Sequence, residues 1–356
     1  MGAVVSALVV VAIVVGVARH RRRKETGIER IRAALGPSLP NVVDNVAFVD
    51  PTQQVPGGGD GALELEPVDF KEHVQQMDAS GELPLNNALI PREIDRSHLT
   101  MIETIGSGAF GAVWKATLDE SASAGGMPGY LVAAKTVLDA AGSKEGRNEL
   151  ISEAVVMAQL TGHPNIVALV GVITRGDPFV LVESYCEHGS LVSYLRKEAI
   201  QGHPPVLKVK VRLATEVAAG MQHLGARRYI HRDLAARNVL VASGLVAKVA
   251  DFGLSRGGKV MQISNKDALG NEEENAGADY YRSKTGMFPI RWTSGEAMET
   301  GIFTAASDVW SFGIVLVELW QDGSQPYGEV STQFVMRNVF ARIKKPLYFM
   351  DINKLN

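Results

Sequence analysis

Apolar and polar residues alternate in short runs through the central part of the chain, and this pattern predicts β-strands. Gly-rich or polar turns separate the runs, and many of their apolar residues are β-branched. Alternation of this kind is typical of strands with one buried face. We therefore predict an antiparallel meander with strands at residues 99–106, 111–118 and 130–138, and two further strands at residues 165–173 and 178–183.

Helical spacing interrupts the series of strands once, after residues 130–138, and prevails after Gly189. Residues 148–160 place apolar side chains on one side of a helix, and residues 308–320 form a nearly all-apolar helix. Strands first and helices later predict an α+β chain in two lobes. The apolar side of the helix at 148–160 consists of Leu150, Ala154, Met157 and Ala158. A later helix has an apolar stripe of Val211, Ala214, Ala218, Met221 and Leu224.

The first 18 residues form an apolar run without a charged side chain, and six basic residues follow at 19–24. As a helix the run would be about 27 Å long, close to the ~30 Å of a bilayer core. Positive charge after the run, rather than before it, argues against a cleaved signal peptide. A buried core helix is the alternative. We expect one transmembrane helix at residues 1–18 and, by the positive-inside rule, a cytoplasmic remainder.

Residues 25–98 have scattered prolines, a Gly-rich stretch at 56–61 and weak periodicity. These features argue against a packed core and indicate a linker, with order beginning near Leu99. The segment contains no tyrosine. The expected organisation is a transmembrane helix at 1–18, a juxtamembrane linker at 19–98 and a folded domain at 99–356.

Composition narrows the class of protein. A chain of 356 residues with 46% hydrophobic residues can bury a sizeable core. Its net charge of -3 gives no support for nucleic-acid binding. The single cysteine, Cys186, excludes an internal disulfide and fits a reducing compartment.

Three glycines, Gly106, Gly108 and Gly111, lie between two predicted strands. Glycine lets backbone N–H groups approach a polyphosphate closely, although a plain hairpin turn has the same composition. A dinucleotide-binding motif would need a helix directly after the glycines, and the residues that follow are strand-like.

Lys135 ends an apolar strand, where an unpaired ammonium group would be costly. It needs a carboxylate partner or access to solvent. Glu153 is the natural partner, because it follows on the next helix beside residues that we expect to be buried. Glu149, one turn earlier, is also acidic, so helix stability does not explain Glu153.

Charged residues interrupt two further apolar runs. Asp233 and Asn238 lie between strand-like segments at 229–241, and Asp251 follows another strand before Phe252. Either acid alone could belong to a turn. Together with Asn238 they supply the oxygen ligands that Mg²⁺ prefers when it also binds substrate phosphates.

These motifs occur in the order and approximate spacing of the protein kinases, which the chain resembles over residues 99 to about 340. The resemblance implies a bilobal fold with a small β-rich N-lobe at 99–187 and a larger helical C-lobe at 188–356. It implies ATP and Mg²⁺ as cofactors, with Asn238 and Asp251 as metal ligands. The catalytic residues implied are Asp233, Lys135, Glu153, Arg237 and Asn238. The nucleotide-binding residues implied are Ile105, Gly106, Ser107, Gly108, Ala109, Phe110, Gly111, Val113, Ala133, Lys135, Glu183, Leu240 and Asp251.

Within this family the chain is similar to receptor tyrosine kinases. Ala235 replaces the lysine usual in serine/threonine kinases, and Ala-Ala-Arg precedes Asn238. The resemblance implies protein tyrosine substrates, a membrane receptor that self-associates, and autophosphorylation at Tyr280 and Tyr281. A phosphate there could pair with Arg232. The alternative is a catalytically silent pseudokinase that binds partners.

Several positions depart from the family pattern. Gly295 replaces a proline, and the arginine that would pair with Glu296 is absent, so we expect a truncated C-lobe, one piece of a longer receptor, and a costly unpaired carboxylate. An acidic insertion at 265–277 is expected to be disordered. Glu183 occupies the position behind the adenine if no gap is allowed, whereas one inserted residue places Val182 there. We prefer Val182, because a charge at that position would be poorly solvated.

Overall fold

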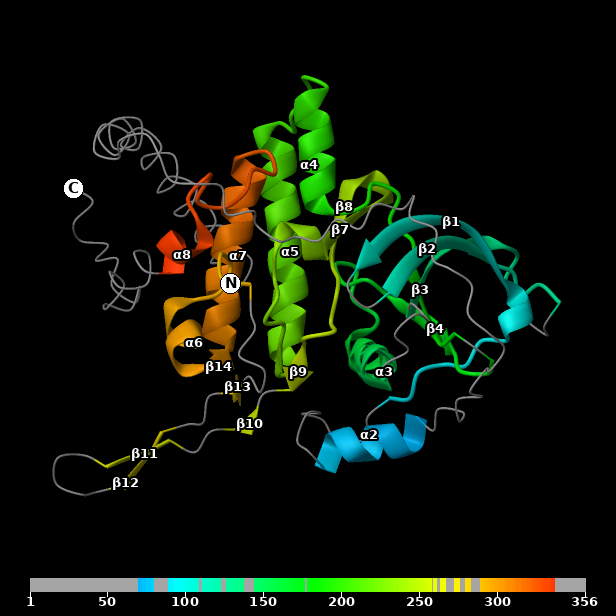
Figure 1. Ribbon diagram of the computed structural model, residues 1–356, viewed down its shortest axis with the longest axis horizontal. Helices are drawn as coiled ribbons and strands as arrows, with labels where there is room; N and C mark the ends of the chain where they lie inside the picture. The colour runs from blue at the N-terminus through cyan, green and yellow to red at the C-terminus, as the bar shows by residue number, and fades with distance from the viewer. Residues whose placement is uncertain are drawn as a thin grey trace, which may run out of the picture. The chain divides into compact units, whose positions relative to one another are not determined.

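The computed structural model describes the following parts of the chain (Figure 1): residues 70–79, 89–108, 111–122, 126–137, 144–176, 178–257, 259–260, 263–266, 272–275, 279–282 and 289–336. The transmembrane helix expected at residues 1–18 and most of the linker lie outside these residues. Within the described ranges, no helix combines the length and apolar character needed to cross a membrane.

A five-stranded antiparallel sheet forms the first part of the folded chain, as the alternating pattern predicted. Its strand order is β1-β2-β3-β5-β4. The first three strands form the predicted meander, whereas β3 pairs with β5, and β4 lies at the edge beyond β5. One face packs into a core that includes Ile94, Ala116, Val132 and Val182. The strands are β1 (Leu99–Gly108), β2 (Gly111–Leu118), β3 (Tyr130–Val137), β4 (Leu169–Ile173) and β5 (Val180–Ser184).

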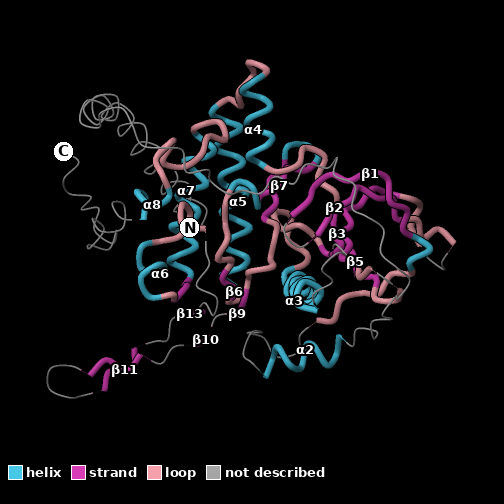
Figure 2. The backbone as a smooth tube through the Cα atoms, viewed as in Figure 1, coloured by secondary structure: helices cyan, strands magenta, loops and turns pink. Residues whose placement is uncertain are grey.

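Helix α3 (Lys144–Leu160) lies beside the sheet (Figure 2) and confirms the helix predicted from residue 148 onward. Its apolar residues Leu150, Ala154, Met157 and Ala158 are all buried. Glu153 is buried among them, so the helix carries a carboxylate on its inner side.

The expectation that order begins near Leu99 is wrong. Ile94 packs into the core of the sheet, and Glu93 forms a parallel bridge with Val172. Upstream, α2 (Phe70–Ala79) contacts α3 through a hydrogen bond of 3.2 Å between His73 and Ser152, and Phe70 lies against Phe179. Phe70 and Met77 are buried. Apolar residues spaced seven apart give this otherwise polar segment a packing face.

The second part of the chain is mainly helical, as predicted. The apolar stripe of α5 is rotated from its predicted position: Leu213, Val217 and Leu224 are fully buried, whereas Val211 and Met221 are half-buried. The elements of this part are the helices α4 (Leu191–Ile200), α5 (Leu207–Ala226), α6 (Gly295–Thr300), α7 (Ala305–Trp320) and α8 (Thr332–Phe334), the 3-10 turns η3 (Ala236–Asn238) and η4 (Ser243–Leu245), and the strands β6 (Tyr229–Ile230), β7 (Val239–Ala242), β8 (Val246–Val249) and β14 (Ile302–Thr304). A further turn, η1 (Arg96–His98), precedes β1.

Short strands also occur where the acidic insertion was expected to be disordered. In β11 (Ile263–Lys266) and β12 (Glu272–Asn275) the backbone pairs in antiparallel register. This pairing includes residues 265–266 and 272–275 of the insertion, whereas its residues 267–271 and 276–277 lie outside the described ranges. The neighbouring strands are β9 (Arg256–Gly257), β10 (Lys259–Val260) and β13 (Asp279–Arg282), of which β13 pairs with β14.

The predicted cost of a buried, unpaired Glu296 does not arise. Glu296 lies exposed in the first turn of α6, where a carboxylate is favoured by the helix dipole. The Ser294 side chain caps this helix by accepting a hydrogen bond from the backbone N–H of Ala297. With Gly295 at the first helical position, the helix still begins normally.

Candidate active site

The structure brings Lys135, Glu153 and Asp251 together from three separate elements. The Nζ atom of Lys135 on β3 lies 2.8 Å from both carboxylate oxygens of Glu153 on α3. The Oδ1 atom of Asp251, just after β8, lies 4.0 Å from the same Nζ. The partner predicted for Lys135 is therefore confirmed, because an ammonium group on an inner face requires a carboxylate.

The electrostatic surroundings keep Lys135 charged. Burial alone would lower the pKa of its ammonium group, but the carboxylates of Glu153, Asp251 and Glu183 together raise it. An ammonium surrounded by acids retains its proton and can bind further anionic groups.

The position of Glu183 corrects our preference for Val182. Val182 is buried in the core on one face of the sheet. Glu183 pairs in register with Ala133 of β3 and therefore shares the opposite face with Ala133 and Lys135. The ungapped interpretation is the one that the strand register supports. We rejected it because of the charge, and the ammonium group of Lys135 on the same face partly offsets the cost of burying that charge.

The Gly-rich segment forms the end of the β1–β2 hairpin. Gly106 pairs with Val113, which in turn pairs with Lys135 on the neighbouring strand. A Cβ atom at Gly111 would lie 1.9 Å from the carbonyl oxygen of Thr136, so only glycine permits this approach of β2 to β3. Ser107 and Gly108 belong to β1, and residues 109–110 (Ala109 and Phe110) lie outside the described ranges.

Three predicted site residues meet in the segment between β6 and β7. The Oδ1 atom of Asp233 accepts a hydrogen bond from Arg237, and its Oδ2 atom accepts one of 2.8 Å from Asn238. Asn238 also donates to the backbone carbonyl of Asp233 at 2.8 Å. Burial raises the pKa of Asp233, although Arg237 and His231 oppose the shift. The carboxylate is thus oriented by two donors while remaining partly accessible.

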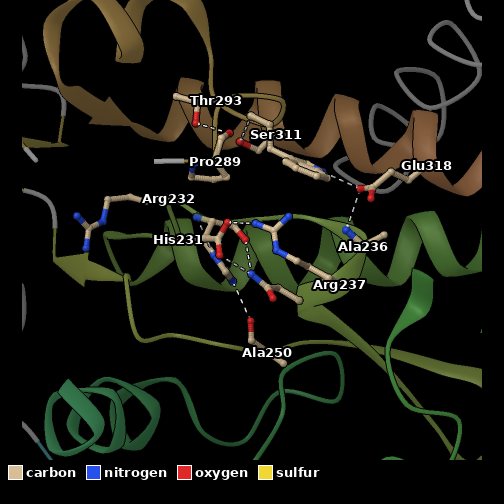
Figure 3. A network of polar contacts seen from close by, with 12 residues as sticks. His231, Arg232, Ala236, Arg237, Ala250, Pro289, Thr293, Ser311 and Glu318 are labelled. Carbon is tan, nitrogen blue, oxygen red and sulfur yellow. Dashed lines mark hydrogen bonds and ion pairs between the residues drawn. The ribbon is translucent and has the colours of Figure 1, made fainter. Parts of the chain in front are cut away.

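Two buried acids of α7 support this segment, and neither was predicted from the sequence. Figure 3 shows one of them, Glu318, beside Ala236. Asp308 accepts hydrogen bonds from the backbone N–H groups of His231 at 2.8 Å and Arg232 at 3.0 Å. Glu318 accepts one of 2.9 Å from the backbone of Ala236. Acids within a nearly all-apolar helix were the available signal, because buried carboxylates need such donors.

A tryptophan connects the same segment to the residues that follow the insertion. Trp292 donates from Nε1 to Glu318 at 2.9 Å, and its backbone carbonyl accepts from Ser311 at 2.8 Å. The guanidinium of Arg237 lies 4.4 Å from the centroid of the Trp292 ring, within cation–π range. Arg237 therefore contacts both Asp233 and Trp292.

The donor atoms at Asn238 and Asp251 fit a hard divalent cation. The Nδ2 atom of Asn238 donates a hydrogen bond to Asp233. The carboxylate of Asp251 is half-exposed, and the backbone of this residue has a positive φ of 62°. Among the described residues, no group of three or more His, Cys, Asp and Glu could hold a metal by itself. An amide oxygen and a carboxylate oxygen are ligands that suit Mg²⁺ when it also binds phosphates.

The other predicted residues are distributed around this centre. Ala133 on β3 is buried, Ile105 on β1 is exposed, and Leu240 on β7 is half-buried. Leu240 bridges to Ser190, which caps α4, and so connects β7 to the segment after β5. Tyr280 and Tyr281 lie on β13, apart from these residues in sequence.

A five-stranded sheet that carries a Lys–Glu pair, followed by a helical part that carries the Asp233 segment, defines the bilobal class of protein kinases. A family model described as protein tyrosine and serine/threonine kinase matches residues 99–349, and the chain belongs to this family.

Several ephrin receptors are similar to the chain. It is 41% identical to ephrin type-B receptor 1 of Gallus gallus over 251 residues, which is 70% of this chain and 23% of the relative. It is 42% identical to ephrin type-B receptor 3 of Danio rerio over 248 residues, 70% of this chain and 45% of the relative. Identity to ephrin type-A receptor 5 of Rattus norvegicus is 40% over 250 residues, 70% and 22% of the two chains. The match thus spans less than half the length of these curated relatives.

Proposed function

We propose that the chain is the kinase part of a receptor-type protein tyrosine kinase, which transfers the γ-phosphate of ATP to tyrosine hydroxyls of proteins. The observation that carries this proposal is the convergence of Lys135, Glu153 and Asp251 within 4.0 Å, although they belong to separate elements. An ammonium group paired with one carboxylate and close to a second is suited to hold a nucleotide's phosphates beside a bound cation.

In the proposed mechanism, Asp233 accepts the proton of the substrate hydroxyl. Arg237 and Asn238 hold its two carboxylate oxygens and fix its orientation. Lys135 binds the phosphates, and Ala133, Leu240 and Val113 contact the adenine ring. Asn238 and Asp251 would hold Mg²⁺, which neutralises charge on the transferring phosphoryl group when it is bound.

Specificity for tyrosine rests on the surroundings of Asp233. Ala235 leaves the second position after the acid without a lysine, and Arg237 lies against the ring of Trp292, which follows the insertion in the chain. Similarity to ephrin receptors supports the same assignment.

The apolar residues 1–18 and the basic residues 19–24 support anchoring in a membrane by a single span, with the kinase part in the cytoplasm. We further propose self-association of the receptor, with phosphorylation of Tyr280 and Tyr281 in trans. Protein tyrosine substrates are the partners, and the net charge of -3 gives no reason to propose nucleic acid.

The test is phosphoryl transfer from MgATP to a Glu/Tyr copolymer, with the purified chain and its Lys135→Met variant. The parent should phosphorylate this copolymer and not one in which serine replaces tyrosine. Lys135→Met should lose about a hundredfold or more of the activity, because the phosphates lose their cationic partner. Equal background from both proteins, with folding intact, would contradict the proposal and favour a silent pseudokinase.

A further inference from the structure

Glu183 is a buried acid whose side chain lies on the inner face of the sheet. Side chains alternate along a strand. Val180 and Val182 pack into the core on one face, so Glu183 lies on the other. Its register partner is Ala133, two residues from Lys135 on the same face of β3. Only 8% of Glu183 is exposed to solvent.

The charges of three carboxylates consequently act on Lys135. Glu153 contacts its Nζ through both oxygens at 2.8 Å, Asp251 lies at 4.0 Å, and Glu183 adds a third attractive charge. If all four groups are ionised, the cluster has two uncompensated negative charges. A polyphosphate bound at Lys135 would add more negative charge, so the third acid opposes the binding of such a ligand.

The carboxyl group of Glu183 gains or loses its charge close to neutral pH. Burial raises the pKa of its carboxyl group to about 7; Lys135 opposes the shift, and Glu153 and Asp251 reinforce it. The nearby thiol of Cys186 has a pKa raised by burial to about 12 and stays neutral. These groups come from β3, α3 and the segments after β8 and β5.

We propose that Glu183 is a positioning residue for Lys135 that sets how strongly Lys135 binds phosphate groups. When Glu183 is protonated, it does not compete for the ammonium group of Lys135, which then interacts with Glu153 and with the phosphates. With its charge, Glu183 competes for the ammonium and repels the polyphosphate. This inference rests on the proposed nucleotide-binding function, and the first of the two experiments below does not depend on a nucleotide.

The first experiment measures unfolding of the chain by denaturant from pH 5 to pH 8 without nucleotide. A carboxyl group with a raised folded-state pKa contributes its full stabilisation below the unfolded pKa and loses it as pH rises through the folded pKa. The parent should therefore lose stability between about pH 5 and 7, and Glu183→Gln should remove part of this loss. In the Lys135→Met background, the pH range over which Glu183→Gln changes the stability should move to higher pH. The reason is that the ammonium group, which opposes the raised pKa of Glu183, is then absent.

Identical pH dependence of the parent and Glu183→Gln would overturn the proposal. So would a Glu183→Gln effect that is unchanged when Lys135 is replaced, because the acid would then act independently of the ammonium group. Within each background, the comparison of chains with and without Glu183→Gln cancels the part of the Glu153 titration that does not depend on Glu183.

The second experiment measures the Kd of MgADP by calorimetry at pH 6 and pH 8. At pH 8, Glu183→Gln should bind about fivefold to tenfold more tightly than the parent, and the two should converge at pH 6. The ratio of the two affinities cancels the titration of the nucleotide's own phosphates. Glu299→Gln, which removes an exposed acid on α6, should behave like the parent at both pH values.

The outcomes separate this inference from the proposed function. Equal affinity of the parent and Glu183→Gln for MgADP at pH 8 would overturn the proposed role of Glu183 but not the proposed function. A difference of the same size at both pH values would also overturn it, because it would indicate a contact with the purine rather than a charge effect. Absence of MgADP binding by all variants would overturn the proposed function and, with it, control of phosphate binding.

Discussion

Arg237 contacts two groups with different tasks, the carboxylate of Asp233 and the ring of Trp292. Burial raises the pKa of Asp233, and the Arg237 guanidinium opposes this shift. Replacing Arg237 by alanine should therefore raise the pKa of Asp233 further and move the acidic limb of the pH–rate profile to higher pH. The measurement is kcat/KM for a tyrosine copolymer between pH 5 and 9.

The Arg237→Lys variant is the matched control for charge. Lysine keeps the positive charge but loses the planar group that stacks on Trp292. Its acidic limb should stay close to that of the parent while kcat falls. If alanine and lysine displace the profile equally, the charge of Arg237 does not set the protonation of Asp233.

At the scale of single residues, sequence predicted the Lys135–Glu153 pair because a charge on an apolar strand needs a partner on the next buried element. The choice between Val182 and Glu183 could not be made in the same way. Strand β5 is buried on both faces, so no alternation of polar and apolar residues marks its inner side. Only the register with β3 identifies Glu183 as the residue beside Ala133.

At the scale of elements, α7 supports the segment that carries Asp233. Replacing Asp308 by alanine leaves the N–H groups of His231 and Arg232 buried without their acceptor. Each unsatisfied donor costs about 1–3 kcal/mol, so the free energy of unfolding should fall by about 2–6 kcal/mol. Denaturant unfolding measures this loss.

The neighbouring residue provides the control for the Asp308 experiment. Val309 lies on the same helix but is 69% exposed, so Val309→Ala should change stability by less than about 0.5 kcal/mol. Asp308→Asn keeps one acceptor oxygen and should lie between alanine and the parent. Equal losses from Asp308→Ala and Val309→Ala would mean that the two hydrogen bonds contribute nothing to stability.

Helix α2 contacts α3 through His73 and contacts the residue before β5 through Phe70. Phe70→Ala should release α2, because the Phe70 ring packs 6.3 Å from that of Phe179 and is buried. Hydrogen exchange of the α2 amides should become about tenfold faster or more, while exchange in β3 and β5 changes little. Gln75→Ala, at an exposed position of the same helix, should not accelerate exchange.

Sequence predicted the strands, α3 and the later helices because each has a long and regular apolar pattern. It did not predict α2, in which few apolar residues, including Phe70 and Met77, lie among charged and polar ones. The segments on both sides of α2 have the composition of a linker, so its short apolar face did not indicate a helix. The rotation of the α5 stripe has another cause: a Cβ atom at Gly220 would lie 2.5 Å from the carbonyl oxygen of Asn165, so the helix packs closest along Gly220 and Leu224.

At the scale of the whole molecule, the two tyrosines of β13 are the proposed link between self-association and activity. Phosphate at Tyr280 or Tyr281 adds close to two negative charges and could pair with Arg232, which precedes Asp233. Such pairing would order the segment after β8 around the site. The Tyr280→Phe/Tyr281→Phe variant should therefore show a lower kcat than the parent after both are incubated with MgATP.

Transfer between two copies of the chain can be separated from transfer within one copy. A Lys135→Met chain lacks the ammonium group that binds phosphates but retains both tyrosines, so it should be phosphorylated only when the parent is added. The initial rate should rise with parent concentration, and mass spectrometry should find phosphate on Tyr280 and Tyr281 of the variant. The same chain with both tyrosines changed to phenylalanine controls for other sites. Phosphate that appears on the parent at a rate independent of its concentration, and never on Lys135→Met, would contradict transfer in trans, because a reaction confined to one chain does not depend on encounters between two.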